Sequence, residues 1–226
     1  MSDIENSNPE LTPTKSGVDQ TRRRLTGAGL AGSGVLLTLA SRPVLAQGGI
    51  CLSPSGFQSG NLSRPNQGNT PCAGRTPGYW GEKNSLAQGA WAAADSIPGV
   101  CNSQSGNCDL LGWHDTGSVI ATKFCSVFAC GGVLANYQNV PGLYPTKQMS
   151  LMQVMHLNGS QDPYQFGAHM VAAYLNAKSG KNTTPSVSAI LTMAAAIAAT
   201  GSYSPAAGIF WSRAQVVTYL KTTMPL

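Results

Sequence analysis

The second half of the chain repeats apolar residues with the period of a helix. Asp162 and Pro163 open one such stretch, since Asp is a favoured N-cap and Pro is favoured at the first helical position. Gly180 provides a C-terminal stop. The apolar positions between them share one helical face: Phe166, Met170, Val171, Tyr174 and Leu175. The pattern therefore predicts an amphipathic helix that begins after Asp162.

Two further helices are predicted downstream by the same signals, a cap and an apolar stripe. The first has Thr184 as N-cap and Pro185 at the first helical position, and it ends at Gly201. The second begins at Ser212. Their expected inward-facing residues are Val187, Ile190, Leu191, Ala194 and Ile197 in the first, and Val216, Val217 and Leu220 in the second.

Shorter helical patterns precede these helices. They cover an Ala-rich stretch at 84–96, an apolar stretch at 119–137 that Gly131-Gly132 interrupts, and a short stretch at 149–157. Residues 99–117 are rich in Gly, Asn and Asp and indicate a loop. Strand-like alternation is scarce. We therefore predict a mainly α single domain of about five to seven short helices, with an irregular, disulfide-stapled N-terminal third.

The patterning divides the chain into three parts. Residues 1–46 have the pattern of a cleavable export signal. Residues 47–75 contain Gly, Ser, Asn, Pro and Gln with few apolar anchors, which indicates an irregular arm or linker. Residues 76–226 carry the helical patterns and are long enough to form one domain with its own core.

The export signal is of a particular type. Arg22 and Arg23 precede a mild apolar run at 25–40 that several glycines dilute, and Val44 and Ala46 occupy the positions of a small-residue cleavage site. The arginine pair resembles the twin-arginine (Tat) signal of bacteria. The run is shorter than the roughly 20 residues of a spanning helix. We expect cleavage after Ala46 and no permanent membrane span; an ordinary Sec signal and an uncleaved anchor are the alternatives.

Charge is sparse in the rest of the chain. Nine of the 14 basic and five of the nine acidic residues lie in 47–226, whereas typical domains have about 25% charged residues. The basic residues are scattered along the sequence, which disfavours a nucleic-acid partner. A low-charge surface rich in Ser, Thr, Asn, Gln and Gly suits a periplasmic, cell-surface or extracellular protein.

All six cysteines follow the leader: Cys51, Cys72, Cys101, Cys108, Cys125 and Cys130. An even number of cysteines in an exported chain indicates up to three disulfides. Sequence alone cannot choose among the possible pairings, but short loops favour Cys51–Cys72, Cys101–Cys108 and Cys125–Cys130. A metal site is the weaker alternative, since the chain has no C-x-x-C pair and no Cys/His cluster with zinc spacing. We expect no metal and no cofactor.

One short motif stands out, "TPGYW" at Thr76, Pro77, Gly78, Tyr79 and Trp80. The Pro-Gly pair predicts a type II turn, with Gly at the position that needs positive φ. Large aromatic residues are mostly buried. We therefore predict that Trp80 is an anchor of the core with Tyr79 at its boundary, and we keep an exposed binding platform as the alternative.

The motif resembles the T-P-G-Y-W-K sequence that opens a class of secreted and surface proteins of bacteria and archaea. Cys72 shortly before the motif, "FGAHMVAAYLNA" at 166–177 and "SRAQVVTYLK" at 212–221 extend the resemblance over most of 72–226. Gly81-Glu82 replaces the Lys-Asn-His run that usually follows the tryptophan. The resemblance implies a secreted module and implies no particular reaction.

The inventory of reactive side chains after the leader is small. Three histidines and five carboxylates are present, without a G-x-S-x-G, P-loop or H-E-x-x-H motif. The candidates for catalysis are His114, Asp115, His156 and His169. Three of them also have a structural explanation: Asp115 in a loop turn, His156 at a helix end and His169 at the border of a buried face. His114 and Asp115 are adjacent in sequence, and adjacent residues rarely form a catalytic dyad.

Two functions therefore remain open at the level of sequence. The first is an exported cell-surface or extracellular structural or interaction module with an unknown surface or extracellular partner. The alternative is a secreted metal-dependent or hydrolytic enzyme that uses His114, Asp115, His156 and His169. The two differ in whether these four side chains converge on one concave site.

Overall fold

The structure, a computed structural model, describes residues 51–59, 71–82, 86, 88–101, 108–140 and 148–225. All of them belong to the second of the chain's two units, Pro43–Leu226. The predicted leader at 1–46, with Arg22, Arg23 and Ala46, lies outside the described residues. Within the described part, no helix combines the length and the apolar character that a bilayer crossing requires.

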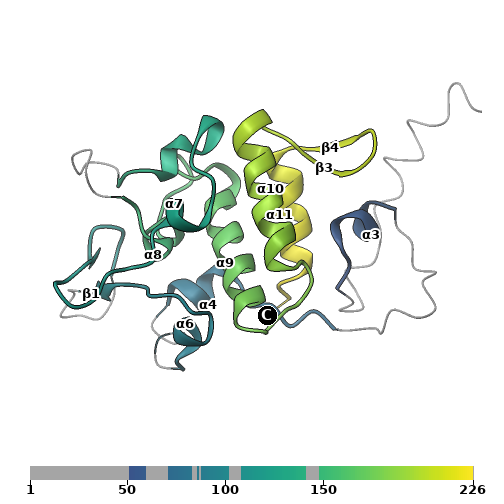
Figure 1. The fold of residues 1–226 in the computed structure, drawn as a ribbon. Helices are drawn as coiled ribbons and strands as arrows, with labels where there is room; N and C mark the ends of the chain where they lie inside the picture. Colours follow the sequence, from purple (N-terminus) through teal and green to yellow (C-terminus); the bar gives the residue numbers. More distant parts are fainter. Residues whose placement is uncertain are drawn as a thin grey trace, which may run out of the picture. The chain divides into compact units, whose positions relative to one another are not determined.

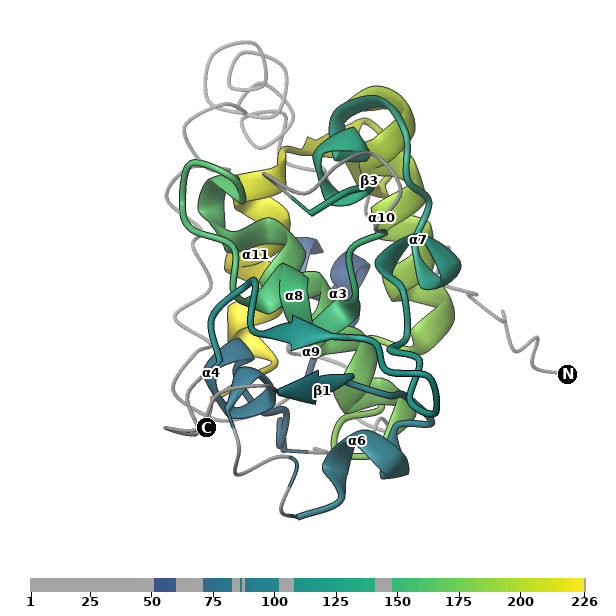
Figure 2. The ribbon, with the colours of Figure 1, turned by 90° about the vertical axis from the view of Figure 1, so that its left-hand side faces the viewer.

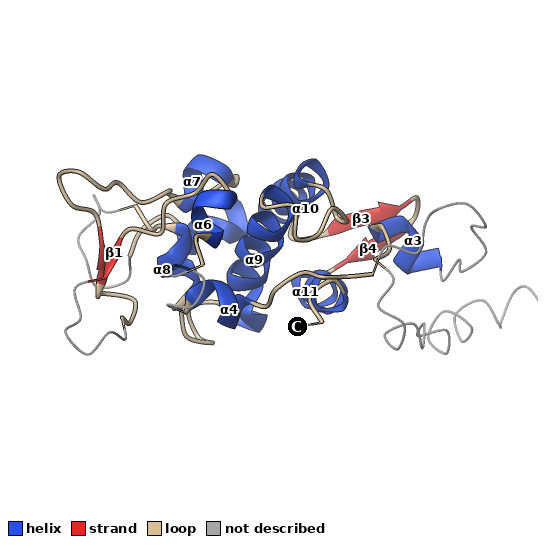
Figure 3. Cartoon of the chain, turned by 90° about the horizontal axis from the view of Figure 1, so that it is seen from below, coloured by secondary structure: helices blue, strands red, loops and turns tan. Residues whose placement is uncertain are grey.

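Helix α9 (Phe166–Lys178) is the centre of the described unit. It contacts α8 (Leu151–Met155) on one side and α10 (Val187–Thr200) and α11 (Arg213–Thr222) on the other, as Figures 1 and 3 show. Every residue from 166 to 176 is buried. The predicted helix is therefore present, but it is covered on all sides instead of along one face.

Small side chains allow this close coverage of α9. Ala168, Ala172 and Ala173 are buried in it together with Gly167. A Cβ at Gly167 would lie 2.7 Å from a ring carbon of Tyr137 and 2.7 Å from a methyl carbon of Val154. The neighbouring elements thus approach the backbone of α9 at a distance that only glycine permits.

Asp162 caps α9 from further back than the sequence predicts. Residues Pro163–Gln165 form a 3-10 turn, η3, and α9 begins at Phe166. The carboxylate of Asp162 accepts hydrogen bonds from the backbone N–H groups of Gly167 (2.9 Å) and Ala168 (3.0 Å). The N-cap residue of α9 is Gln165, so the predicted helix start is wrong by three residues, although the Asp162 side chain does bind N–H groups of the first turn. The backbone between them is left-handed at Tyr164 (φ 65°) and Gln165 (φ 55°).

The two C-terminal helices follow the sequence closely. Ser212 caps α11 in a reciprocal capping box with Gln215, as its position predicts. Helix α10 ends at Gly201, whose φ of 76° is typical of a helix stop. Its predicted N-cap is wrong, because Ser186 rather than Thr184 accepts the hydrogen bond from the N–H of Ala189. Ser186 has the extended backbone that an N-cap requires, so Pro185 precedes the cap.

The helices of the first half are short. They are α3 (Pro54–Ser59), α4 (Pro77–Gly81), α6 (Ala90–Ala93), α7 (Phe124–Val127) and the 3-10 helix η2 (Gly132–Tyr137). The helix predicted over 84–96 is not continuous, because Gly89 is left-handed (φ 65°) directly before α6; Leu86 is also helical. The stretch 119–137 forms α7 and η2 on either side of Gly131, as predicted in outline.

Two short antiparallel pairings correct the prediction of a mainly helical fold. Strand β1 (Val100–Cys101) pairs with β2 (Trp113–His114), and β3 (Tyr203–Ala206) pairs with β4 (Ile209–Trp211). Figure 2 shows the first pair on the side of the unit that faces the viewer. Strands of two to four residues are too short to carry a recognisable alternation, so the unit mixes helices with short strands.

The arm predicted as irregular contains a docked helix. Phe57 of α3 packs edge-on against Trp211 and Tyr219, with ring centroids 5.8 and 5.3 Å away. The Trp211 indole donates to Gln58 Oε1 (2.8 Å), and the Tyr219 hydroxyl donates to the carbonyl of Leu52 (2.9 Å). One aromatic anchor and two hydrogen bonds therefore attach this segment to the C-terminal elements.

Candidate functional site

The Thr76–Trp80 motif starts a helix in place of the predicted turn. Thr76 is extended, Pro77 is the first residue of α4, and Gly78 lies inside the helix, so the type II turn prediction is wrong. Proline is compatible with the first helical position because no intrahelical partner is lost there. Trp80 is fully buried and Tyr79 is half-buried, as predicted for a core anchor with a tyrosine at its boundary.

Asn176 of α9 holds the motif in place. Its Oδ1 accepts hydrogen bonds from the backbone N–H of Arg75 (2.8 Å) and from the Trp80 indole (3.1 Å). Its Nδ2 donates to the carbonyl of Arg75 (2.8 Å). The side chain is only 1% exposed, so these bonds form away from water. Asn176 is not among the site residues predicted from the sequence, although a polar residue inside an otherwise apolar helix is a signal that points to it.

A second tryptophan extends this cluster to α6. The indole of Trp91 donates to the carbonyl of Trp80 (3.1 Å), and the two rings meet edge-to-face with centroids 6.2 Å apart. Edge-to-face pairs of this kind add roughly 0.5–1.5 kcal/mol to the burial of the rings. The motif thus anchors α4, α6 and α9 to one another.

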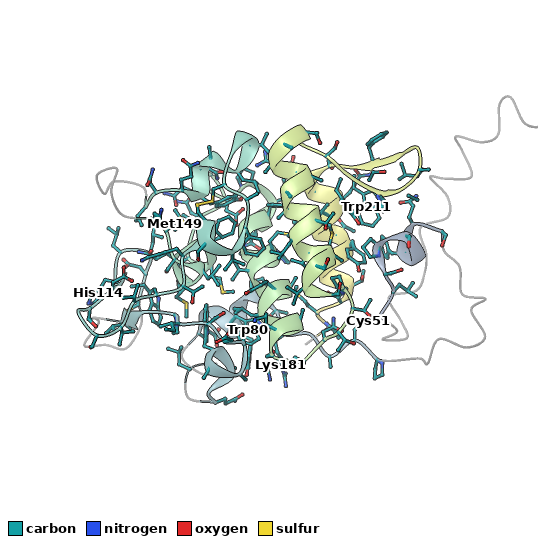
Figure 4. All side chains as sticks on the ribbon, in the orientation of Figure 1. Cys51, Trp80, His114, Met149, Lys181 and Trp211 are labelled. Carbon is teal, nitrogen blue, oxygen red and sulfur yellow. A yellow bond between two sulfur atoms is a disulfide. The ribbon has the colours of Figure 1, made fainter. Side chains whose placement is uncertain are left out.

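A pocket of about 290 Å³ lies elsewhere in the unit and includes two of the candidate residues. Its lining residues include Trp113, His114, Asp115, Lys123, Ser150 and Gln153. Figure 4 labels His114 and Trp80 at separate places in the unit. The pocket has both polar and apolar walls, which suits a small polar molecule that also has an apolar side.

Hydrogen bonds engage the polar groups of this pocket. Asp115 accepts from the ammonium of Lys123 (2.5 Å) and from the backbone N–H of Ala121 (2.9 Å). Nδ1 of His114 lies 3.1 Å from the carbonyl oxygen of Gly112. Lys123 was not a candidate in the sequence analysis, because it lies eight residues from Asp115 and no local pattern joins the two.

Gln153 connects the pocket to α8. Its Nε2 donates to the carbonyl of Trp113 (3.0 Å), and its Oε1 accepts from the backbone N–H of Ser150 (2.9 Å) in a capping box. Gln153 is also absent from the predicted site residues, although Ser150 followed by Gln three residues later is a capping signature. This glutamine fixes the β2 strand that carries His114.

His156 follows α8 and supports the same strand from another direction. The Trp113 indole donates to its Nε2 (3.1 Å). Burial lowers the pKa of His156 below its usual value, while a hydrogen bond to the backbone of Gly81 and the charge of Asp109 act in the opposite direction. The neutral imidazole is the form that can accept the hydrogen bond from Trp113.

His169 lies apart from the other three candidates. Its Nδ1 is 2.8 Å from the carbonyl oxygen of Gln165, in the first turn of α9, and the side chain is buried. Burial lowers its pKa, the carbonyl of Gln165 raises it, and the positive charge of Lys221 lowers it further. His114 and Asp115 therefore share a pocket, His156 reaches Trp113 on its wall, and His169 contacts none of them within the described residues.

The described ranges contain no group of three or more His, Cys, Asp or Glu side chains that could hold a metal ion. The six cysteines form three disulfides, Cys51–Cys72, Cys101–Cys108 and Cys125–Cys130. These are the pairings that the short loops favour. The first ties the arm to the segment before α4, and the other two close loops beside β1 and α7.

No family model, no curated protein and no solved structure matches this chain.

Proposed function

We propose that the protein is exported and acts at the cell surface or outside the cell as a structural or interaction module. The observation that carries the proposal is the set of three disulfides. Disulfides persist in oxidising compartments and are rare in the cytosol. The twin-arginine pattern at 1–46 and the resemblance of Thr76–Trp80 to a class of secreted and surface proteins support the same location.

The contacts of the candidate side chains support binding over catalysis. His156 holds Trp113, His169 holds the first turn of α9, and Asp115 holds Lys123. These contacts give the three side chains structural roles within the fold. A catalytic base is instead expected to face a substrate within hydrogen-bond reach.

An enzyme that uses His114 and Asp115 is the alternative, and the pocket that the two residues line is the observation in its favour. Such an enzyme would be hydrolytic or metal-dependent. Its activity would disappear on His114→Ala, whereas a binding module would keep its interaction.

Cell fractionation tests the location. We expect the full chain to be exported, to begin at Gln47 after cleavage and to contain no free thiol. The variant Arg22→Lys with Arg23→Lys should stay in the cytoplasm with its leader intact if the Tat route is used. A parent protein found in the cytoplasm with six reduced cysteines would overturn the proposal.

Sedimentation with washed cell envelopes tests the interaction role. The purified exported protein should sediment with envelopes from the producing cells, and His114→Ala and Asp115→Asn should sediment equally well. Hydrolysis of an envelope component that these two variants abolish would reject the module and support the enzyme.

A further inference from the structure

Two positively charged side chains lie against the Tyr79 ring of the Thr76–Trp80 motif. The guanidinium carbon of Arg75 lies 5.3 Å from the centroid of the Tyr79 ring, and the ammonium nitrogen of Lys181 lies 5.6 Å from it. Figure 4 places the labelled Lys181 beside Trp80, at the C-terminal end of α9. Residues from two distant parts of the chain therefore meet at this tyrosine.

These two cations are not matched by nearby carboxylates of the described part of the chain. The ion pairs found there join Lys123 to Asp115 and Lys178 to Asp95. A cation over an aromatic face gains about 0.5–1 kcal/mol at an exposed site, and two cations that share one ring also repel each other. Anionic groups that bind beside these two cations would offset this repulsion.

The backbone around these side chains is held firmly. Asn176, which is almost fully buried, binds both the N–H and the carbonyl of Arg75. The Tyr79 hydroxyl donates to Oε1 of Gln88 (2.8 Å), which orients the ring. Lys181 directly follows Gly180, the left-handed residue (φ 72°) just after α9. Groups that are positioned before binding lose less entropy when a ligand arrives.

From this geometry we propose that Arg75, Tyr79 and Lys181 bind the carboxylate groups of an acidic polysaccharide. The guanidinium can hold a carboxylate through two parallel hydrogen bonds, and the ammonium adds a second charge. The half-buried Tyr79 ring and the exposed Gln88 amide would supply an apolar and a hydrogen-bonding contact for the sugar itself. A polymer fits a site with only two cations, because weak contacts add up along repeated units.

The inference rests on the proposed function, since an acidic polysaccharide of the cell surface is accessible to an exported protein. The site has few charges, and a nucleic acid would require a longer basic track. Binding should weaken as salt is added, because exposed charges are screened over about 8–10 Å at ionic strengths of 0.1–0.15 M.

Affinity electrophoresis of the exported protein tests the site, with polygalacturonate as the carboxylated probe, polyphosphate as the phosphorylated probe and dextran as the neutral one. We expect retardation by polygalacturonate alone. The double variant Arg75→Gln/Lys181→Gln should weaken it about tenfold, since each exposed ion pair contributes up to about fivefold. The melting temperature should change little. Tyr79→Leu should weaken binding further than Tyr79→Phe, which keeps the ring.

The matched control is Arg213→Gln/Lys221→Gln, which removes the same two charges elsewhere. An equal loss of binding in this control would show general electrostatic attraction and overturn the proposal. Retardation by polyphosphate in place of polygalacturonate, or by neither polymer, would also overturn it. Because the binding assay uses purified protein, a failure there is distinct from a failure of export, which fractionation detects separately.

Discussion

Single residues inside the unit show how polar groups are accommodated in its core. Asn176, Asp162 and Gln153 are buried, and each binds backbone groups of another segment. Within the described residues, every buried side-chain nitrogen and oxygen has a hydrogen-bond partner. A buried polar group without a partner costs about 1–3 kcal/mol. These side chains therefore favour the arrangement in which the segments that they bind lie next to each other.

Tyr137 is another buried polar residue, and its protonation state decides whether it can donate its hydrogen bond. Its hydroxyl donates to Asp162 (2.6 Å), and both residues are fully buried. Burial raises the pKa of Tyr137 far above its usual value, and the negative charge of Asp162 raises it further. The tyrosine therefore remains a hydrogen-bond donor to the carboxylate that caps α9.

The two buried histidines predict how stability depends on pH. Burial lowers the pKa of both His156 and His169 in the folded state, whereas an unfolded histidine titrates near pH 6.5. As the pH falls through about 6.5, the unfolded chain takes up protons that the folded chain resists. The free energy of unfolding should therefore decrease below about pH 6.5, until the lower folded pKa values are reached, and these two groups should add no slope above it.

Urea unfolding at several pH values measures this effect. We expect a smaller decrease below pH 6.5 in His156→Gln and in His169→Gln than in the parent. His156→Gln keeps an oxygen that can accept from the Trp113 indole, so its stability near pH 7.5 should suffer least. A decrease that is the same in the parent and in both variants would contradict the assignment.

At the scale of elements, α9 determines how tightly its neighbours pack. Tyr137 of η2 and Val154 of α8 both lie against Gly167, and both are fully buried. Protein interiors are packed as densely as organic crystals. Neither neighbour can therefore move away without opening a gap elsewhere.

We expect Gly167→Ala to destabilise the unit. Alanine favours a helix by about 1 kcal/mol over glycine, but the added methyl would lie 2.7 Å from two buried side chains. Overpacking typically costs about 1–3 kcal/mol, so we predict a net loss of about 1 kcal/mol in urea unfolding. Gly159→Ala is the control, because a Cβ there meets nothing within 4 Å. If Gly167→Ala were as stable as the parent, the neighbours of α9 would be able to accommodate a methyl group there, and the prediction would be wrong.

At the scale of the whole molecule, the three disulfides lie in the first half of the described unit, where the helices and strands are short. Cys51–Cys72 closes a separation of 21 residues, whereas Cys125–Cys130 closes only 5. A longer closed loop removes more freedom from the unfolded chain. The first bridge also retains the segment through which Phe57 reaches Trp211 and Tyr219.

Paired serine substitutions separate these contributions. Cys51→Ser/Cys72→Ser should lower the free energy of unfolding by about 3 kcal/mol, and Cys125→Ser/Cys130→Ser by about 2 kcal/mol, from loop entropy alone. Chemical denaturation of the exported variants measures both. A larger loss from the shorter loop would show that Cys125–Cys130 supports native packing beside α7 instead of acting through the unfolded chain.

The sequence by itself determined the elements whose signals are local. The start of α11 after Ser212 and the end of α10 at Gly201 depend on residues a few positions apart. Short loops favoured the disulfide pairings that the structure has, although the sequence left the other pairings open. The burial of Trp80 also followed from residue type. Caps, helical periodicity and loop closure act over such distances, which is why they can be read without the fold.

Only the tertiary structure decided which distant segments meet. Asn176 binds Arg75 across 101 residues, and Trp211 binds Gln58 across 153. The burial of α9 on all sides from Phe166 to Asn176, the two short strand pairs and the meeting of Arg75 and Lys181 at Tyr79 are of the same kind. Such contacts arise from the packing of elements, and no pattern of neighbouring residues encodes them, because their partners are neighbours only after the chain has folded.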